Sequence, residues 1–200
     1  MDILRKLAFE NNIELSQNQI DLFEKYLQLL LKWNRVYNLT SIKKKEEIMT
    51  KHFFDSLTLV KLFEMVGINP VGKEIGDFGT GAGFPGVPLK IYYQDKIDLY
   101  LIESIGKKCM FLETLKRELN LDFKVLCQRA ESIDKKFDIV VSRATGETFE
   151  VLKIGKNMLK DNGYIVIMKG KDVEEELKNF TFTLNFKGFP ERKFIVIQKR

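Results

Sequence analysis

A glycine-rich segment in the middle of the chain constrains the fold more than any other feature. Residues 77–86, Asp-Phe-Gly-Thr-Gly-Ala-Gly-Phe-Pro-Gly, follow a short apolar run and precede a helical pattern. Glycines suit this place because a tight turn needs unusual backbone angles and a ligand must approach the bare backbone. Pro85 suits the first turn of the following helix, where its missing N–H costs nothing. The segment predicts a strand, a ligand-binding turn and a helix.

The rest of the second part of the chain alternates short apolar runs with helical patterns. We expect strands at 74–78, 97–102, 123–127, 137–141 and 163–168, and helices near 85–93, 106–119, 148–159 and 172–177. This alternation predicts an α/β fold with a mostly parallel sheet covered by helices on both faces. Two further apolar runs, 180–186 and 194–198, flank a polar segment at 187–192 and predict a C-terminal antiparallel hairpin.

The first seventy residues read as helical. Ser16 and Gln19 fit a capping box, and apolar residues recur at helical spacing from Ile20 to Leu30. A second helical pattern covers about 46–65, and the segment 67–72 is a natural break. We therefore expect an N-terminal helical extension over residues 1–70 and a core over residues 71–200, together forming one compact unit.

Composition limits the chemistry and the location. A net charge of +5 favours an anionic partner. Two cysteines and one histidine cannot assemble the usual zinc sites and leave little material for a hydrolase, so no metal is expected. The chain shows no apolar stretch of membrane-spanning length and no signal peptide, which predicts a cytoplasmic protein with no membrane partner. In a reducing compartment, Cys109 and Cys127 should be free thiols rather than a disulfide.

Two classes of ligand compete for the glycine-rich turn. Dinucleotide-binding folds place a pyrophosphate there and prefer the spacing G-x-G-x-x-G. Here Gly79, Gly81 and Gly83 are spaced G-x-G-x-G, and Asp77 stands just before them. A carboxylate is unfavourable beside a pyrophosphate but favourable beside the cationic amino and sulfonium groups of S-adenosylmethionine. A nicotinamide-dependent oxidoreductase is therefore the weaker alternative.

Other polar residues follow the later strands, at the sheet edge where open α/β sheets bind ligands. Glu103 ends the second strand, where an acidic residue accepts hydrogen bonds from ribose hydroxyls of either cofactor. The dipeptide 130–131 follows the third strand, where an adenine ring can lie. Arg143 and Lys169 end the fourth and fifth strands, and each can hold a phosphate, stack on a base or form an ion pair.

These motifs, taken together and in order, resemble a known family. The matching segments are 33–34, 38–41, 52–57, 77–86, 103–108, 142–144 and 168–170. The sequence closely resembles the bacterial small-subunit (16S) ribosomal RNA guanine-N7 methyltransferases, the glucose-inhibited division protein B family. The resemblance implies a Rossmann-like S-adenosylmethionine-dependent methyltransferase core with an N-terminal helical extension. It also implies methyl transfer to N7 of one guanine, conventionally numbered 527.

The candidate site residues follow from the motifs and the resemblance together. The expected cofactor-binding residues are Asp77, Gly79, Gly81, Gly83, Phe84, Glu103, Ala130, Glu131 and Arg143. The candidate substrate contacts are Arg143, Lys169 and Asn38, and no catalytic residue is certain.

Few catalytic residues are expected, because guanine N7 carries a lone pair in the neutral base and needs no general base. The expected partner is 16S ribosomal RNA or the small ribosomal subunit, with the protein as a monomer. The N7 edge of a paired guanine lies in a groove too narrow for side chains, so the target should be a looped or flipped base. The alternatives are a methyltransferase acting on another RNA, a protein or a small molecule, and a non-catalytic RNA-binding module.

Overall fold

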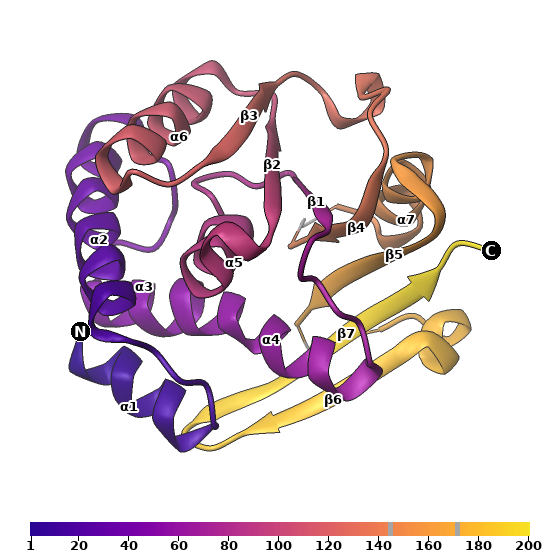
Figure 1. The fold of residues 1–200 in the computed structure, drawn as a ribbon, viewed down its shortest axis with the longest axis horizontal. Helices are drawn as coiled ribbons and strands as arrows, with labels where there is room; N and C mark the ends of the chain where they lie inside the picture. Colours follow the sequence, from indigo (N-terminus) through magenta and orange to yellow (C-terminus); the bar gives the residue numbers. More distant parts are fainter. Residues whose placement is uncertain (144–145, 171–172) are drawn as a thin grey trace.

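A seven-stranded sheet forms the centre of the computed structural model, which describes residues 1–143, 146–170 and 173–200. Its strands lie in the order β3-β2-β1-β4-β5-β7-β6 (Figure 1). The strands are β1 (Glu74–Phe78), β2 (Asp98–Glu103), β3 (Phe123–Cys127), β4 (Phe137–Ser142), β5 (Leu159–Lys169), β6 (Thr181–Phe186) and β7 (Phe189–Gln198). Neighbours among β1–β5 pair in parallel, whereas β7 is antiparallel to β5 and β6. The predicted α/β sheet with a C-terminal hairpin is confirmed.

The sheet has two buried faces because successive side chains of a strand point to opposite sides. One face packs against the helices on the N-terminal side of the chain, through Ile75, Leu99, Leu101, Ile139, Val141 and Val166. The other face packs against the helix that follows β4, through Phe78, Tyr100, Ile102, Val140, Ile165 and Ile167. Burial on both faces explains why these strands read as continuous apolar runs.

Helices follow the strands as expected for this alternation. They are α5 (Gly86–Tyr93), α6 (Gly106–Leu119) and α7 (Thr148–Asn157), with short 3₁₀ turns η2 (Gln94–Lys96), η3 (Ala130–Ser132) and η4 (Glu175–Phe180). The predicted helix near 172–177 is wrong in extent and type, because the described part is the 3₁₀ turn η4 and Asp172 lies outside the described residues.

The N-terminal segment forms α1 (Asp2–Glu10), α2 (Gln17–Tyr37), α3 (Lys45–Ile48), the π-helical turn η1 (Met49–Phe54) and α4 (Asp55–Val66). The predicted capping box is confirmed: the Gln19 backbone N–H donates to the Ser16 hydroxyl, and the Ser16 backbone N–H donates to the Gln19 side chain. Gln19 also donates to the backbone carbonyls of Ile91 and Tyr92, at 3.2 and 2.8 Å. These bonds attach α2 directly to α5.

The C-terminal hairpin is longer than expected. We expected a polar connection over 187–192 between strands at 180–186 and 194–198. The turn is instead only Lys187 and Gly188, and β7 already begins at Phe189. Gly188 has a φ of +71°, which favours glycine in such a tight turn. The correction matters because it places Arg192 within a strand.

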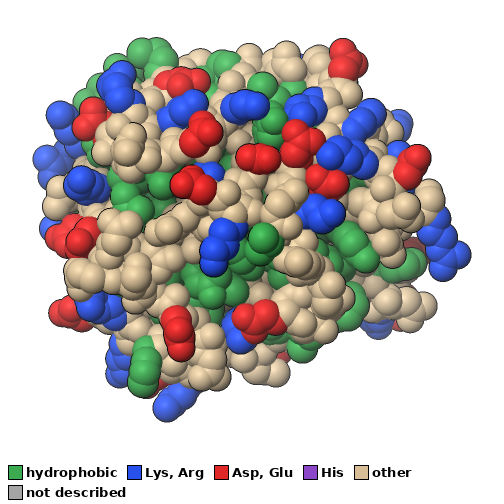
Figure 2. Space-filling view, in the orientation of Figure 1, with side chains coloured by type: hydrophobic (Ala, Val, Ile, Leu, Met, Phe, Trp, Pro, Cys, Tyr) green, Lys and Arg blue, Asp and Glu red, His purple; other side chains and the backbone are tan. Residues whose placement is uncertain are grey.

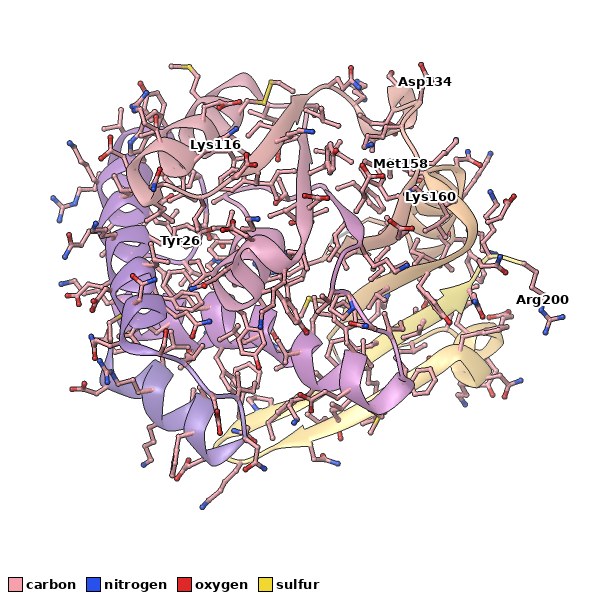
Figure 3. All side chains as sticks on the ribbon, in the orientation of Figure 1. Tyr26, Lys116, Asp134, Met158, Lys160 and Arg200 are labelled. Atoms are coloured by element: carbon pink, nitrogen blue, oxygen red, sulfur yellow. A yellow bond between two sulfur atoms is a disulfide. The ribbon has the colours of Figure 1, made fainter. Side chains whose placement is uncertain are left out.

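The two cysteines form a disulfide, so the expectation of free thiols is wrong. Cys109 lies on α6 and Cys127 ends β3, with their Cα atoms 5.8 Å apart (Figure 3). The expectation followed from the assumed compartment and not from geometry. The packing of α6 against β3 brings the two positions within bonding distance.

The surface is mixed in charge. Figure 2 shows Lys and Arg side chains interspersed with Asp and Glu side chains on the face seen in Figure 1, so the net positive charge does not gather into one patch there. Among the described residues, no helix is both long enough and apolar enough to span a membrane.

Candidate functional site

The glycine turn (residues 79–85) joins β1 to α5 and depends on its glycines. The φ values of Gly79, Gly81 and Gly83 are +66°, +63° and +100°. Residues that carry a side chain rarely adopt such values. A Cβ on Gly83 would lie only 2.7 Å from the hydroxyl oxygen of Tyr26. That hydroxyl donates to the backbone carbonyl of Ala82 at 2.5 Å, so a side chain of α2 stabilises the turn. Burial raises the pKa of Tyr26 well above its usual value and keeps it a donor.

Asp77 braces the same turn from the strand. Its side chain is fully buried, and Oδ2 accepts hydrogen bonds from the Thr80 hydroxyl at 2.6 Å and the Gly86 backbone N–H at 2.7 Å. Burial raises the pKa of Asp77 to about 7. Its other oxygen, Oδ1, is buried without a hydrogen-bond partner in the described part of the chain. A buried unpaired carboxylate oxygen is unusual and fits a site that a cationic ligand completes.

Glu103, at the end of β2, connects the glycine turn to the start of α6. Its Oε2 accepts from the Gly81 backbone N–H at 3.0 Å, and its Oε1 accepts from the backbone N–H groups of Ser104 and Ile105 at 2.9 Å. The carboxylate is almost completely buried. Because a carboxylate oxygen has two lone pairs and Oε2 accepts only one hydrogen bond from the described residues, Oε2 can still accept from a ligand hydroxyl.

A pocket of about 260 Å³ opens at the carboxyl ends of β1, β2 and β3. Four predicted cofactor residues line it: Gly79, Glu103, Ala130 and Glu131. Its other lining residues are Phe78, Ile102, Ser104, Gln128, Arg129, Gly146, Glu150, Val151 and Ile154. The remaining predicted cofactor residues, Asp77, Gly81, Gly83, Phe84 and Arg143, do not line this pocket. The lining combines apolar side chains with the carboxylates of Glu103, Glu131 and Glu150, which suits a nucleoside.

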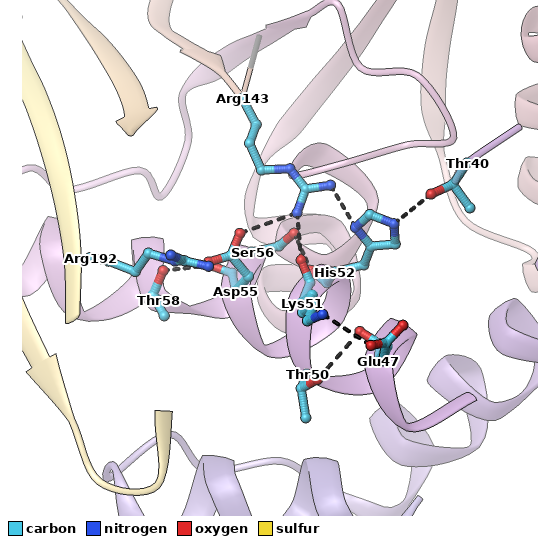
Figure 4. Close-up of polar contacts among 10 residues, drawn as sticks. All are labelled: Thr40, Glu47, Thr50, Lys51, His52, Asp55, Ser56, Thr58, Arg143 and Arg192. Carbon is cyan, nitrogen blue, oxygen red and sulfur yellow. Dashed lines mark hydrogen bonds and ion pairs between the residues drawn. The ribbon is translucent and has the colours of Figure 1, made fainter. Parts of the chain in front are cut away.

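Arg143 lies just beyond β4 and is held by residues of η1 and α4 (Figure 4). One terminal nitrogen donates to the backbone carbonyl of Lys51 at 3.0 Å and to the Asp55 carboxylate at 3.2 Å. The other terminal nitrogen is 2.8 Å from Nδ1 of His52. These contacts fix the orientation of the guanidinium, which also lies 5.2 Å from the ring centre of Phe84.

His52 is a neutral imidazole of defined tautomer. Since Arg143 can only donate, Nδ1 of His52 must accept, and Nε2 carries the proton that it donates to the Thr40 hydroxyl at 2.8 Å. Burial and the nearby Arg143 lower the pKa of His52 to about 3. The ring stacks on Phe84 with centroids 4.4 Å apart. His52 therefore connects Arg143 to the residue that follows the last glycine of the turn.

Arg192 reaches the same cluster from the hairpin. Its Nε donates to Oδ1 of Asp55, opposite the oxygen that Arg143 contacts (Figure 4). Asp55 is 4% exposed, so one buried carboxylate joins two arginines. We call Arg143 and Arg192 the arginine pair.

The two other candidate substrate contacts have other surroundings than the arginine pair. Lys169 ends β5, and its amino group donates to the Thr148 hydroxyl at 2.6 Å and lies 3.5 Å from the Glu174 carboxylate. Asn38 is exposed at the end of α2, with a left-handed φ of +49°. The predicted site residues thus form three groups and two separate residues. The groups are the residues that line the pocket, those in or beside the glycine turn, and Arg143 with its partners; the separate residues are Lys169 and Asn38.

Sequence reasoning did not select Thr40, His52, Asp55 and Arg192 as site residues. The first three had a signal, because they fall in the segments 38–41 and 52–57 that carry the family resemblance. Arg192 had none, because 187–192 was interpreted as a loop.

Comparison with known proteins gives one consistent family. The model of the family described as rRNA small subunit methyltransferase G matches residues 19–200. A protein named ribosomal RNA small subunit methyltransferase G from Aquifex aeolicus is 47% identical over 198 residues, covering 98% of this chain and 100% of that protein. A protein of the same name from Desulfitobacterium hafniense is 42% identical, covering 83% of this chain and 69% of that protein.

Solved structures show the same fold at low identity. A magnesium protoporphyrin IX methyltransferase from Synechocystis, solved with bound S-adenosylmethionine, has a TM-score of 0.61 at 15% identity, covering 94% of this chain and 99% of that one. A 16S rRNA methyltransferase from T. thermophilus, solved with S-adenosylmethionine and guanosine, has a TM-score of 0.55 at 21% identity, covering 73% of this chain and 43% of that one. The predicted Rossmann-like methyltransferase fold is confirmed.

Proposed function

The chain belongs to the rRNA small subunit methyltransferase G family, and we propose that it transfers a methyl group from S-adenosylmethionine to N7 of a guanine in 16S ribosomal RNA. The observation that carries this proposal is a pocket at the carboxyl ends of β1–β3, with a glycine turn on one side. The target position, guanine 527, is part of the proposal.

The residues of the site fit the cofactor. Glu103 would accept from the ribose hydroxyls, and Gly79, Ala130 and Glu131, which line the same pocket, would hold the rest of the nucleoside. The unpaired Oδ1 of Asp77 would accept from the cationic amino acid end of the cofactor. Gly81 and Gly83 keep the turn free of side chains. Phe84 and Arg143, which lie next to each other, would contact the cofactor on the side of η1.

In this reaction the protein must orient the two reacting molecules, and it need not remove a proton. When bound, S-adenosylmethionine supplies an electrophilic methyl group on a positively charged sulfur. Guanine N7 attacks with its own lone pair, so no side chain must act as a base. His52 agrees with this, since both of its ring nitrogens are engaged, with Arg143 and Thr40. Alignment of the reacting atoms contributes on the order of 7–11 kcal/mol in well-oriented systems.

The RNA is proposed to approach the carboxyl edge of the sheet, where Arg143 follows β4 and Lys169 ends the adjacent strand β5. Asn38 is exposed beside the turn that carries Thr40, and we propose it as a contact to the flipped guanine or its neighbours. The protein acts as a monomer in the cytoplasm, on naked 16S RNA or on the small ribosomal subunit.

The test is to incubate the purified protein with unmodified 16S rRNA, small ribosomal subunits and S-adenosylmethionine carrying a radiolabelled methyl group. Borohydride reduction followed by aniline cleaves RNA at N7-methylguanine, so the proposal expects one new cleavage position. Label at another atom or base would contradict the N7 assignment. Label that enters only small molecules would contradict the RNA substrate.

A further inference from the structure

The cluster formed by the buried Asp55 carboxylate and the arginine pair has one excess positive charge. Asp55 accepts from Arg143 through Oδ2 and from Arg192 through Oδ1. The side chains of Arg143 and Arg192 are 22% and 21% exposed, so the excess charge reaches the surface. A buried ion pair needs one partner of each sign, and the second arginine therefore exceeds what Asp55 requires.

The register of the hairpin explains why Arg192 lies at this edge. Lys193 pairs with Lys169, the last residue of β5. Because β7 is antiparallel to β5, its early residues lie at the carboxyl edge of the parallel strands, where the pocket and Arg143 are found. The hairpin thus brings positive charge from residues 192–193 to the edge where ligands of such sheets bind.

The hydrogen-bond donors of the two arginines are used differently. Both terminal nitrogens of Arg143 have protein acceptors, in Lys51, Asp55 and His52. Arg192 uses Nε on Asp55, and within the described residues its terminal nitrogens have no acceptor. The ring of Phe189 lies 5.0 Å from its guanidinium carbon and supports the group from one side. Arg192 is therefore a fixed guanidinium with donors to spare, which is the geometry that binds a phosphate.

We propose that Arg192 binds a backbone phosphate of the substrate RNA, while Asp55 fixes its orientation. The proposal rests on the proposed function, since it names a contact to the RNA of that reaction. The phosphodiester is the expected ligand because RNA presents phosphates on every nucleotide, and base edges are read by other groups.

The experiment compares the salt dependence of RNA binding between the wild-type protein and Arg192→Gln, with an unmodified 16S rRNA transcript as the probe. Each phosphate contact contributes about 0.7 to the slope of log affinity against log salt for single strands. We expect the slope of Arg192→Gln to be smaller than that of the wild type by about 0.7. The ratio of wild-type to variant affinity should therefore fall roughly threefold between 50 and 200 mM salt. Arg117→Gln is the matched control, since Arg117 is 73% exposed on α6, and its slope should equal that of the wild type.

A second set of measurements separates a phosphate contact from a structural role. Arg192→Gln should keep the wild-type affinity for S-adenosylmethionine and the wild-type kcat, and raise only KM for RNA. Arg192→Lys, which keeps the charge, should recover most of the salt slope. An unchanged slope in Arg192→Gln, or an equal loss of cofactor affinity, would overturn this inference. If the wild-type protein itself neither bound nor methylated the transcript or the subunit, the proposed function would fail instead.

Discussion

Arg143 donates a hydrogen bond of 2.8 Å to Nδ1 of His52, which makes the single histidine of the chain an acceptor rather than an acid. His52 in turn donates to Thr40 and stacks on Phe84. One ring thus links the polar turn after α2, the glycine turn and the end of β4.

The rate of methyl transfer should depend more on the hydrogen-bond acceptor Nδ1 of His52 than on the stacking of its ring. His52→Phe keeps an aromatic ring beside Phe84 but removes the acceptor, whereas His52→Asn keeps an oxygen acceptor near the Nδ1 position and removes the ring. We expect His52→Phe to lower kcat about tenfold, because the guanidinium of Arg143 loses a partner, and His52→Asn to retain more activity. Steady-state methyl transfer to 16S rRNA measures both, and the reverse order of activities would contradict the prediction.

Arg143→Ala should reduce methyl transfer at least tenfold while the protein remains folded. Asp55 keeps Arg192 as a partner, so no buried charge is left unpaired. Arg143→Lys should rescue little activity, since a single amino group cannot serve Lys51, His52 and Asp55 together. Thermal unfolding and methyl transfer are measured in parallel, and near-normal activity in Arg143→Ala would refute the assigned role.

Cofactor affinity should depend on pH through Asp77. Its pKa of about 7 means that the carboxyl ionises as the pH rises through neutrality, and a cationic ligand needs the ionised form. If only that form binds, the apparent affinity should be about tenfold weaker at pH 6 than at pH 8. Titration of the wild type and of Asp77→Asn at both values separates this effect from ionisation of the cofactor. Equal pH dependence in the two proteins would speak against it.

The same shift sets the sign of a stability effect in the ligand-free protein. The pKa of Asp77 in the folded protein lies above its usual value of 3.8, so the carboxyl loses its proton at a lower pH in the unfolded chain. The contribution of Asp77 is therefore most favourable below about pH 4 and is lost as the pH rises through 7.

Gly86→Ala tests the close approach between the start of α5 and the strands β1 and β2. A Cβ at this position would lie 2.5 Å from a Leu101 methyl and 2.7 Å from Oδ2 of Asp77. We expect a loss of about 1–3 kcal/mol in the free energy of unfolding and weaker cofactor binding. Gly106→Ala is the matched control, because a Cβ there meets open space at the start of α6. Denaturant unfolding of both variants measures the difference, and equal stabilities would contradict it.

The disulfide should contribute to stability. Its cysteines are 18 residues apart, and a closed loop of that size corresponds to about 3 kcal/mol in the chain-entropy model. Adding a dithiol reductant should lower the unfolding temperature of the wild-type protein and leave that of the double variant Cys109→Ala/Cys127→Ala unchanged. If the reductant did not shift the wild type, the two thiols would be free in solution.

Local patterns predicted most of the fold. Strands buried on both faces leave apolar runs, and the capping box marks the start of α2, so both were visible in the sequence. The hairpin turn was misplaced because Pro190 and the charges around it resemble a loop, although the first residues of a strand tolerate proline. The disulfide was missed because it depends on how α6 packs against β3.

The candidate site was only partly visible for a related reason. The glycine turn, Glu103 and the dipeptide 130–131 follow directly from the strand and turn pattern, and all lie at one edge of the sheet. The partners of Arg143 come from η1 and α4, and Arg192, which shares Asp55 with it, comes from β7; all are distant from Arg143 in the chain. Their meeting depends on helix packing and strand register, neither of which leaves a local signal.

The amide of Asn11 bonds to the backbone of Lys187 in both directions, at 3.1 and 2.7 Å, across 176 positions of the chain. Helix α1 and the hairpin turn therefore fasten each other (Figure 1). During synthesis, residue 11 leaves the ribosome long before residue 187. The contact between α1 and the hairpin turn therefore forms only after nearly all of the chain has been made. A nascent chain stalled before the hairpin would contain the glycine turn but would lack both the Asn11–Lys187 hydrogen bonds and the strand that carries Arg192.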